Sequence, residues 1–341
     1  MAFPQISKIN LERLRIADKR LGNVLRAHVI ATARTLEQKI ADAGPFNQRV
    51  DPHILTLARN LLVKQGIITP VLVKGMKWYR LTNAHPEQVE ARLQEQQVVH
   101  GATQEKLFTL RLGQAAEIAV YRALLLGNEL TFFGNYPDLD EHDDSTLYTK
   151  EEPPSAVNGR KTPGNKKLDF LLFHRVAGVA GVEVKNVREW MYPDRTEIRE
   201  MIAKCLAIDA VPVLIARRIP YATFSVFNRC GIIIHQLYGQ IYASADQALA
   251  EQARNKKLLG YHDIKVGNQP DARLEHFIQT NLPGLIGAAR EKYELWKEEL
   301  TEYASGAISY KEFIAKLRGT YVSPEEEAEQ QEEADEADDH S

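Results

Sequence analysis

Apolar residues recur at helical spacing through the first part of the chain and then alternate with polar residues. This pattern predicts helices over residues 21–31, 35–43 and 51–66, followed by a β-hairpin over 71–81 that turns near Gly75. Three helices and a hairpin in this order predict a small domain at the start of the chain.

The third predicted helix has clear boundaries. Asp51 stands in the N-cap position, Pro52 occupies the first turn and Gly66 ends the pattern. The helical spacing predicts a buried stripe made of Ile54, Leu57, Ala58, Leu61 and Leu62. The opposite face would then be exposed and would carry His53, Thr56, Arg59, Asn60 and Lys64. The hairpin adds basic residues at or near its tip, namely Lys74, Lys77 and Arg80.

The middle of the chain alternates helix-like and strand-like segments. The predicted order is a helix over 108–127, strands over 129–133, 168–173 and 181–186, a helix over about 195–209, and strands over 211–217 and 231–236. An insertion over 134–167, rich in Pro, Gly, Asp and Lys, interrupts this order, and so long a loop is usually functional or mobile. The order predicts an α/β fold in which helices flank a short mixed central sheet.

These patterns divide the chain into four parts. We expect a small domain with a polar helical linker over 1–100, the α/β domain over 101–244 and a charged helical extension over 245–322. Residues 323–341 lack aromatic and branched apolar side chains, so they predict a disordered acidic tail.

The composition is that of a soluble globular protein. Hydrophobic residues make up 44% of the 341 positions and charged residues 26%, and the length exceeds what one core usually serves. The chain has no uninterrupted apolar run of membrane-spanning length, and its first residues lack the apolar region of a signal peptide, so we expect a cytoplasmic protein without a membrane partner. Cys205 and Cys230 fit neither a disulfide framework nor a zinc site, and we expect both to be buried.

The net charge of −3 conceals a basic body. Residues 325–341 contain ten carboxylates and no Lys or Arg, and removing these ten from the 46 acidic residues leaves 36 against 43 basic residues, or about +7. A body of that charge suits a polyanionic partner such as DNA. The tail either solubilises the protein or mimics nucleic acid and competes for the basic body.

Three helices followed by a basic hairpin resemble the winged helix-turn-helix family, over about 65 residues of this chain. The resemblance implies that the third helix enters the major groove of DNA and that the hairpin, the wing, contacts backbone phosphates. The residues given these roles are Arg59, Asn60, Lys64, Lys74, Lys77 and Arg80. Small winged domains also dock proteins or form dimers, so that alternative stays open.

The segment Gly-Val-Glu-Val-Lys-Asn carries the candidate chemistry. Strand alternation places Glu183 and Lys185 on one face and the two valines on the other. If the preceding strand forms a hairpin with this one, paired residue numbers sum to about 355, so Asp169 falls opposite roughly Asn186 and beside Glu183 and Lys185. Two carboxylates and a lysine on neighbouring strands predict a hard-oxygen site that suits Mg²⁺ or Mn²⁺ rather than zinc.

The order of these residues resembles the PD-(D/E)XK nuclease superfamily, which includes restriction endonucleases and Holliday-junction resolvases. The resemblance covers about 140 residues and comprises a helix with Glu117, a strand, Asp169 opening the next strand, the triplet Glu183-Val184-Lys185, a helix and a strand. Leu168 stands where the family often has proline, a frequent departure, and the 14-residue spacing from Asp169 to Glu183 lies in the family's ordinary range. The resemblance implies a restriction-endonuclease-like fold for this domain.

The resemblance also implies a mechanism. Asp169, Glu183 and the backbone carbonyl of Val184 would hold one or two Mg²⁺ or Mn²⁺ ions, joined by Glu117 as in the resolvase-like branch. A bound water would be the nucleophile. Lys185 would orient or deprotonate that water and stabilise the negative charge that develops on the phosphate.

Each of these residues also has a structural interpretation. Asp169 could cap a strand, and Glu183 could form an ion pair with Lys185 on a solvated face. Glu117 is placed to form an ordinary helix salt bridge. Only the ordered set as a whole favours a catalytic site.

Residues near the motif allow two interpretations as well. Arg199 and Lys204 on the next helix could bind phosphate or lie on a solvated face. Trp190 and Tyr192 could stack on a base or pack against the protein. The carboxylates of 138–144 lack the spacing and glycine of a calcium-binding loop, so we expect a solvated acidic loop.

The sequence contains neither a Gly-x-Ser-x-Gly motif nor a phosphate-binding P-loop, so we expect no serine-hydrolase or NTP-driven chemistry. We predict a Mg²⁺- or Mn²⁺-dependent DNA endonuclease in restriction, phage defence or DNA processing, with a homodimer supplying two sites if both strands are cut. One alternative is a non-catalytic winged-helix DNA-binding regulator on a degenerate nuclease scaffold. Another is a protein-interaction subunit that docks through the wing.

Overall fold

The computed structural model describes residues 8–41 and 50–319, and the chain forms two compact units. The N-terminal unit comprises Met1–Thr109 and Asp246–Ile264, and the sheet unit comprises Leu110–Ala245 and Lys265–Ser341. The boundaries expected at residues 100 and 244 fall close to these breaks, but the two units share the residues that we expected to form one extension over 245–322. The predicted acidic tail over 323–341 lies outside the described residues.

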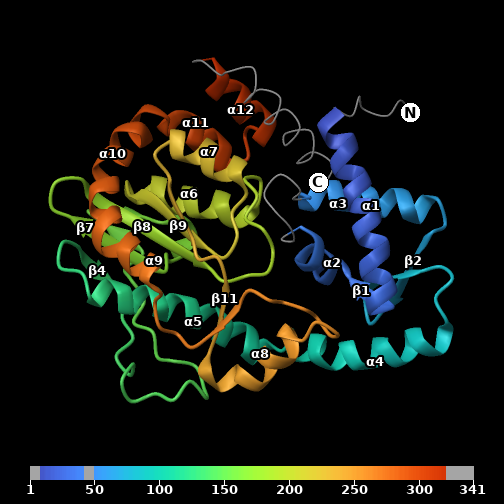
Figure 1. The fold of residues 1–341 in the computed structure, drawn as a ribbon. Helices are drawn as coiled ribbons and strands as arrows, with labels where there is room; N and C mark the ends of the chain where they lie inside the picture. Colours follow the sequence, from blue (N-terminus) through green and yellow to red (C-terminus); the bar gives the residue numbers. More distant parts are fainter. Residues whose placement is uncertain (1–7, 42–49, 320–341) are drawn as a thin grey trace. The chain divides into compact units, whose positions relative to one another are not determined.

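The N-terminal unit packs helices against a three-stranded antiparallel sheet of order β1-β3-β2. Its elements are α1 (Lys8–His28), β1 (Ile30–Thr32), α2 (Ala33–Ile40), α3 (Pro52–Lys64), β2 (Ile68–Val73), β3 (Met76–Leu81), α4 (Pro86–Ala102) and α8 (Gln247–Arg254). Figure 1 shows α1, α2 and α3 gathered beside β1 and β2. The helix predicted over 21–31 overlaps the last part of α1, which begins earlier and already ends at His28. Residues 30 and 31 belong instead to the strand β1, which was not expected.

The turn between β2 and β3 lies where the sequence predicted it. Val73 pairs with Met76, so Lys74 and Gly75 form a two-residue loop. Both have positive φ, at 49° and 79°, which matches the mirror-image turn that joins twisted antiparallel strands. The turn leaves the side chain of Lys74 exposed at the hairpin tip.

The exposed face predicted for α3 is partly wrong. Leu57 is 39% exposed, while Leu55, which the prediction placed outside the stripe, is fully buried. Arg59 is only 8% exposed and its guanidinium lies 4.6 Å from the centre of the Tyr79 ring. The helix is therefore rotated relative to the predicted stripe, because its face with Leu55 and Ala58 packs in one apolar cluster with α1. The buried Arg59 packs against an aromatic ring of β3.

The sheet unit contains a five-stranded mixed sheet, which confirms the predicted mixed α/β class. Its strand order is β10-β9-β8-β7-β4, for strands β4 (Thr131–Phe133), β7 (Phe170–His174), β8 (Gly178–Lys185), β9 (Val211–Ala216) and β10 (Ile233–Gln236). The strands β8, β9 and β10 run parallel, whereas β7 is antiparallel to both β8 and β4.

Helices cover both faces of this sheet. One face packs against α5 (Lys106–Leu125), α9 (Ala272–His276), a π-helical turn (Phe277–Asn281) and α10 (Leu282–Leu295). The other packs against α6 (Thr196–Ile208), α7 (Tyr221–Arg229), α11 (Lys297–Ser305) and α12 (Tyr310–Arg318). The remaining elements are the paired strands β11 (Gln240–Tyr242) and β12 (Ile264–Val266) and a short 3-10 turn (Ser244–Asp246).

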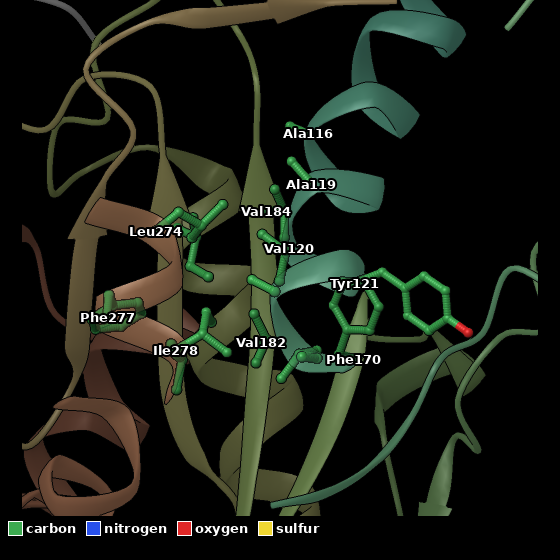
Figure 2. Packing of buried hydrophobic residues seen from close by; sticks show 14 of the residues in the cluster. Ala116, Ala119, Val120, Tyr121, Phe170, Val182, Val184, Leu274, Phe277 and Ile278 are labelled. Atoms are coloured by element: carbon green, nitrogen blue, oxygen red, sulfur yellow. The ribbon is translucent and has the colours of Figure 1, made fainter. Parts of the chain in front are cut away.

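Small side chains line the buried side of α5. Ala115, Ala116 and Ala119 belong to the same buried cluster as residues of the strands. Figure 2 shows Ala119 of α5 facing Val184 of β8, in a cluster that also contains Val182, Phe170 and Leu274 of α9. This packing positions α5 against the C-terminal part of β8.

The hairpin formed by β7 and β8 has a different register from the predicted one. Phe170 pairs with Val182 and His174 with Gly178, so paired numbers sum to 352 rather than about 355. Asp169, one residue before β7, therefore lies level with Glu183 and not with Asn186. The loop is centred one to two residues earlier than expected, because Gly178, with φ of 80°, pairs within the ladder.

The insertion over 134–167 contains only two short strands, β5 (Ala156–Val157) and β6 (Arg160–Lys161), and a 3-10 turn (Pro163–Asn165). Its acidic part is not simply solvated, as we expected. The carboxylate of Asp144 is buried and accepts hydrogen bonds from the Tyr148 hydroxyl, the Asn268 amide and the Ser244 backbone N–H. The insertion is therefore fastened to the rest of its unit at this point.

Cys205 and Cys230 are both buried free thiols, as the sequence predicted. Within residues 8–41 and 50–319, no helix combines the length and apolar character that spanning a bilayer requires.

Candidate functional site

The candidate site lies where β7 begins and β8 ends. Because these strands are antiparallel, Asp169 and Glu183 meet at the open end of the hairpin, away from its turn. The Asp169 backbone N–H donates to the Val182 carbonyl at 3.0 Å, and its carboxylate Oδ2 accepts from the Val184 N–H at 2.7 Å. The carboxylate thus caps the end of the ladder with one oxygen and leaves Oδ1 for other partners.

Glu183 lies between two lysines. Its Oε1 accepts from Lys185 Nζ and its Oε2 from Lys204 Nζ, both at 2.7 Å. Glu183 and Lys185 share one strand face, as predicted, but they are not on a solvated surface, because the Glu183 side chain is only 9% exposed. A buried carboxylate needs such partners to offset its loss of hydration.

Lys204 does not lie on a solvated face of α6. It is buried, and its ammonium also donates to the Lys167 carbonyl at 3.0 Å. The sequence allowed either phosphate binding or exposure, yet the side chain connects α6 to Glu183 and to the residues that lead into β7. This position follows from the close packing of α6 on the sheet face that carries Glu183.

Glu117 reaches the same region from α5, on the opposite side of the sheet. Its Oε2 accepts from the Tyr136 hydroxyl at 2.7 Å and from Lys150 Nζ at 2.6 Å. Lys150 Nζ also lies 3.4 Å from Asp169 Oδ1 and 3.7 Å from Glu152 Oε2. One ammonium therefore bridges Glu117 and Asp169, and the salt bridge of Glu117 is not an ordinary contact within a helix.

The pKa shifts follow from this crowding of charge. Burial raises the pKa of Glu117 and the nearby Asp169 carboxylate raises it further, more than Lys150 and Tyr136 lower it. Burial lowers the pKa of Lys185, but the charges of Glu183 and Asp169 outweigh that effect and raise its pKa above the ordinary value. Lys185 thus stays protonated at neutral pH, which favours a charge-stabilising role over that of a base.

The oxygen atoms of this site suit a hard divalent cation. Glu117 and Asp169 already direct oxygens toward one cation, the Lys150 ammonium. The C=O of a strand residue points to the same side as its N–H, so the Val184 carbonyl also faces the Asp169 side. Such an ion would be held by Glu117, Asp169 and Val184, while Glu183 would join only by leaving one of its lysines.

Among the residues that the structure describes, no three Asp, Glu, His or Cys side chains gather as a ready-made metal site. Glu183 pairs with Lys185 and Lys204, whereas Glu117 and Asp169 share Lys150. With Glu152, four carboxylates and three ammonium groups take part in these contacts.

The residues expected to contact DNA have different surroundings. Asn60, Lys64, Lys74 and Lys77 are exposed in the N-terminal unit, as predicted. Arg80 is half-buried and donates to the carbonyls of Leu81 and Thr82. Arg59 is buried, so its predicted exposed orientation is wrong.

Two aromatic residues and one arginine beside the motif take part in packing. The rings of Trp190 and Tyr192 stack with their centres 6.4 Å apart, and both side chains are half-buried. The guanidinium of Arg199 lies 4.3 Å from the centre of the Tyr303 ring and donates to the Tyr303 carbonyl at 3.2 Å. Arg199 therefore connects α6 to α11 rather than standing free in solvent.

Sequence reasoning missed Lys150 and Tyr136, and it expected Lys204 either to bind phosphate or to lie on a solvated face. Lys150 and Tyr136 lie in the insertion, whose unusual length was the one signal that it takes part in function. Nothing local distinguishes Lys150 from the other lysines of the insertion. Its contacts depend on where the insertion crosses the end of the sheet.

Comparison with known proteins adds no relative. No protein-family model, no curated protein and no solved structure matches this chain.

Proposed function

We propose that this protein is a Mg²⁺- or Mn²⁺-dependent DNA endonuclease of the PD-(D/E)XK kind. One observation carries the proposal. Glu117, Asp169 and the Glu183–Lys185 pair come from separate segments and meet at the open end of the β7–β8 hairpin. The charges of all three carboxylates, Glu183, Asp169 and Glu117, raise the pKa of Lys185, which supports a single site.

The chain's own residues divide the work. When bound, a divalent ion would neutralise charge on the scissile phosphate and lower the pKa of a water molecule that attacks it. Glu117, Asp169 and the Val184 carbonyl would hold the ion. Lys185, which stays protonated, would place its ammonium against the developing negative charge, and Glu183 and Lys204 would fix the position of Lys185.

The N-terminal unit supports DNA as the substrate. Its order of helix, strand, two helices and hairpin is consistent with a winged helix, and its hairpin tip presents the exposed residues Lys74 and Lys77. Phosphate contacts from such lysines would add sequence-independent affinity for duplex DNA. Restriction, phage defence and DNA processing are all settings for a duplex-specific enzyme of this kind.

The test is a cleavage assay on a panel of DNA structures. The full chain is incubated with plasmid, linear duplex, single-stranded and four-way-junction DNA in Mg²⁺ or Mn²⁺, and the cut ends are sequenced. We expect cleavage of at least one substrate, and a loss of at least about a hundredfold in rate for Asp169→Asn. Asp140→Asn, which changes an exposed carboxylate in the insertion over 134–167, is the control and should keep wild-type activity.

Equal behaviour of the wild type and Asp169→Asn on every substrate contradicts the proposal, provided that circular dichroism shows both to be folded. A second function is favoured by one observation, the complete pairing of the three carboxylates with lysines. That balance suits a non-catalytic DNA-binding regulator on a degenerate nuclease scaffold. Such a regulator would retard DNA in a gel without cutting it.

A further inference from the structure

We infer that Lys150 is a built-in competitor of the divalent cation, a tethered ammonium that occupies the position between Glu117 and Asp169 until the metal displaces it. This inference rests on the proposed function, because it concerns regulation of the same site. It assigns a role to a residue of the insertion that the family motif does not include.

The contacts of Lys150 are those of a cation in a carboxylate site. Its Nζ lies 2.6 Å from Glu117 Oε2 and 3.4 Å from Asp169 Oδ1, with Glu152 Oε2 at 3.7 Å. The Lys150 side chain is 11% exposed. These oxygens come from a helix, from the residue before a strand and from the insertion, and the Lys150 ammonium is the cation that they share.

The backbone on either side of Lys150 is fixed, while its side chain can move. Two residues earlier, Tyr148 bonds to the buried Asp144, and its N–H donates to the Gln114 side chain at 2.9 Å. One residue later, Glu151 pairs with Asn135 in a short antiparallel bridge. Withdrawal of the ammonium therefore needs rotation of a flexible four-carbon stem and no unfolding of the insertion.

Competition follows from the charge of the site. Glu117 and Asp169 can satisfy one cation at this point, and bringing a divalent ion beside a buried ammonium would place like charges together. The ion must then bind to the fraction of molecules in which Lys150 has withdrawn, so its apparent affinity is lowered by that fraction. Removing the ammonium removes the competition.

The experiment measures Mn²⁺ binding to the full chain by isothermal titration calorimetry, without DNA. We expect Lys150→Met to bind Mn²⁺ roughly tenfold more tightly than the wild type, since a partly buried ion pair is occupied most of the time. Lys161→Met removes an exposed lysine of the same insertion and should bind as the wild type does. Lys150→Arg keeps the charge and should not gain affinity.

The outcomes separate this inference from the proposed function. If Lys150→Met binds Mn²⁺ as the wild type does, or more weakly, Lys150 is not a competitor and the nuclease proposal is unaffected. Tighter binding by Lys150→Met together with no cleavage of any DNA supports the competitor and contradicts the nuclease. Absence of Mn²⁺ binding in every variant overturns both.

Lys150→Met removes the cation that Glu117 and Asp169 share, which lowers the stability of the fold. A second variant therefore keeps the test decisive if Lys150→Met does not fold. Lys150→Met combined with Glu152→Gln removes one acidic neighbour but keeps Glu117 and Asp169, and it should also bind Mn²⁺ more tightly than the wild type. Thermal unfolding followed by circular dichroism should show a larger stabilisation by Mn²⁺ in both variants than in the wild type. An equal or smaller stabilisation overturns the inference.

Discussion

At the scale of single residues, Glu117 has the most unusual surroundings in the site. It is a carboxylate on a helix that is otherwise packed against the sheet, and it depends on Tyr136 and Lys150 for its hydrogen bonds. Burial raises the pKa of Tyr136 as well, so its hydroxyl remains a donor to Glu117. Glu117 therefore has its donors in place but also has the Asp169 carboxylate nearby, and the two effects oppose each other.

The sign of the balance at Glu117 predicts a pH dependence. Since its folded pKa is raised above the ordinary 4.5, the unfolded chain loses this proton first as pH rises. The wild type then loses stability between about pH 4.5 and the folded pKa. The loss is about 1.4 kcal/mol for each tenfold difference between the acid dissociation constants of Glu117 in the folded and unfolded chain. Glu117→Gln should thus gain stability relative to the wild type as pH rises above 4.5.

Urea unfolding at a series of pH values, without divalent metal, measures this difference in the free energy of unfolding. A relative stability of Glu117→Gln that falls as pH rises would mean that Lys150 dominates and that the folded pKa is lowered.

At the scale of elements, β8 sets the position of the site. Asn186, just after the strand, is buried and bonds to the carbonyls of Leu112 and Ile241, each at 2.6 Å. The Lys185 carbonyl accepts from the Arg217 N–H at 3.0 Å. The end of β8 is therefore held from several sides, which keeps Glu183 and Lys185 in register with Asp169.

The middle of β8 has no room for a larger residue. A Cβ at Gly181 would lie 2.6 Å from Leu168 Cδ1 and 2.8 Å from Cys205 Sγ. We expect Gly181→Ala to cost about 1–3 kcal/mol of stability through overpacking, and to shift the residues that lead into Asp169. Gly284→Ala in α10 is the control, because a Cβ there meets nothing within 4 Å and should be neutral or stabilising by up to about 1 kcal/mol.

Urea denaturation midpoints of the two variants give the comparison. A Gly181→Ala variant as stable as Gly284→Ala would show that α6 can move away from β8 at little cost, and that the packing does not fix the site.

At the scale of the whole molecule, the proposal assigns docking and chemistry to different units. Replacement of Lys74 and Lys77 together by Gln should weaken DNA binding across sequences and flatten the dependence of log K on log salt by up to about 0.9 per lost contact. Cleavage at saturating protein should persist, because the site residues are untouched. Arg80 is left in place, since it bonds to the backbone.

Fluorescence anisotropy at several salt concentrations measures these slopes. The control removes two exposed lysines of the sheet unit, Lys161→Gln with Lys292→Gln, so that the loss of charge is the same. If the wing variant and this control keep the same affinity and slope, the winged segment does not dock DNA and is better interpreted as a dimerisation or partner-binding module.

Much of the architecture could be predicted from local patterns. The alternating face of Glu183 and Lys185, the Lys74–Gly75 turn and the burial of the two cysteines all agree with the structure. These features are determined within a few residues, because the period of a strand and the geometry of a two-residue turn are short-range properties. The sequence by itself therefore determined which side chains share a strand face and where the sheet lies along the chain.

Only the tertiary structure decided how the charges of the site are paired. Lys204 reaches Glu183 across 21 positions, and Lys150 reaches Glu117 across 33. The register of the β7–β8 hairpin and the rotation of α3 also differed from expectation, because each depends on what packs against the element. Ion pairs between distant segments form only where helices and loops are brought together over the sheet, and no spacing along the chain encodes that meeting.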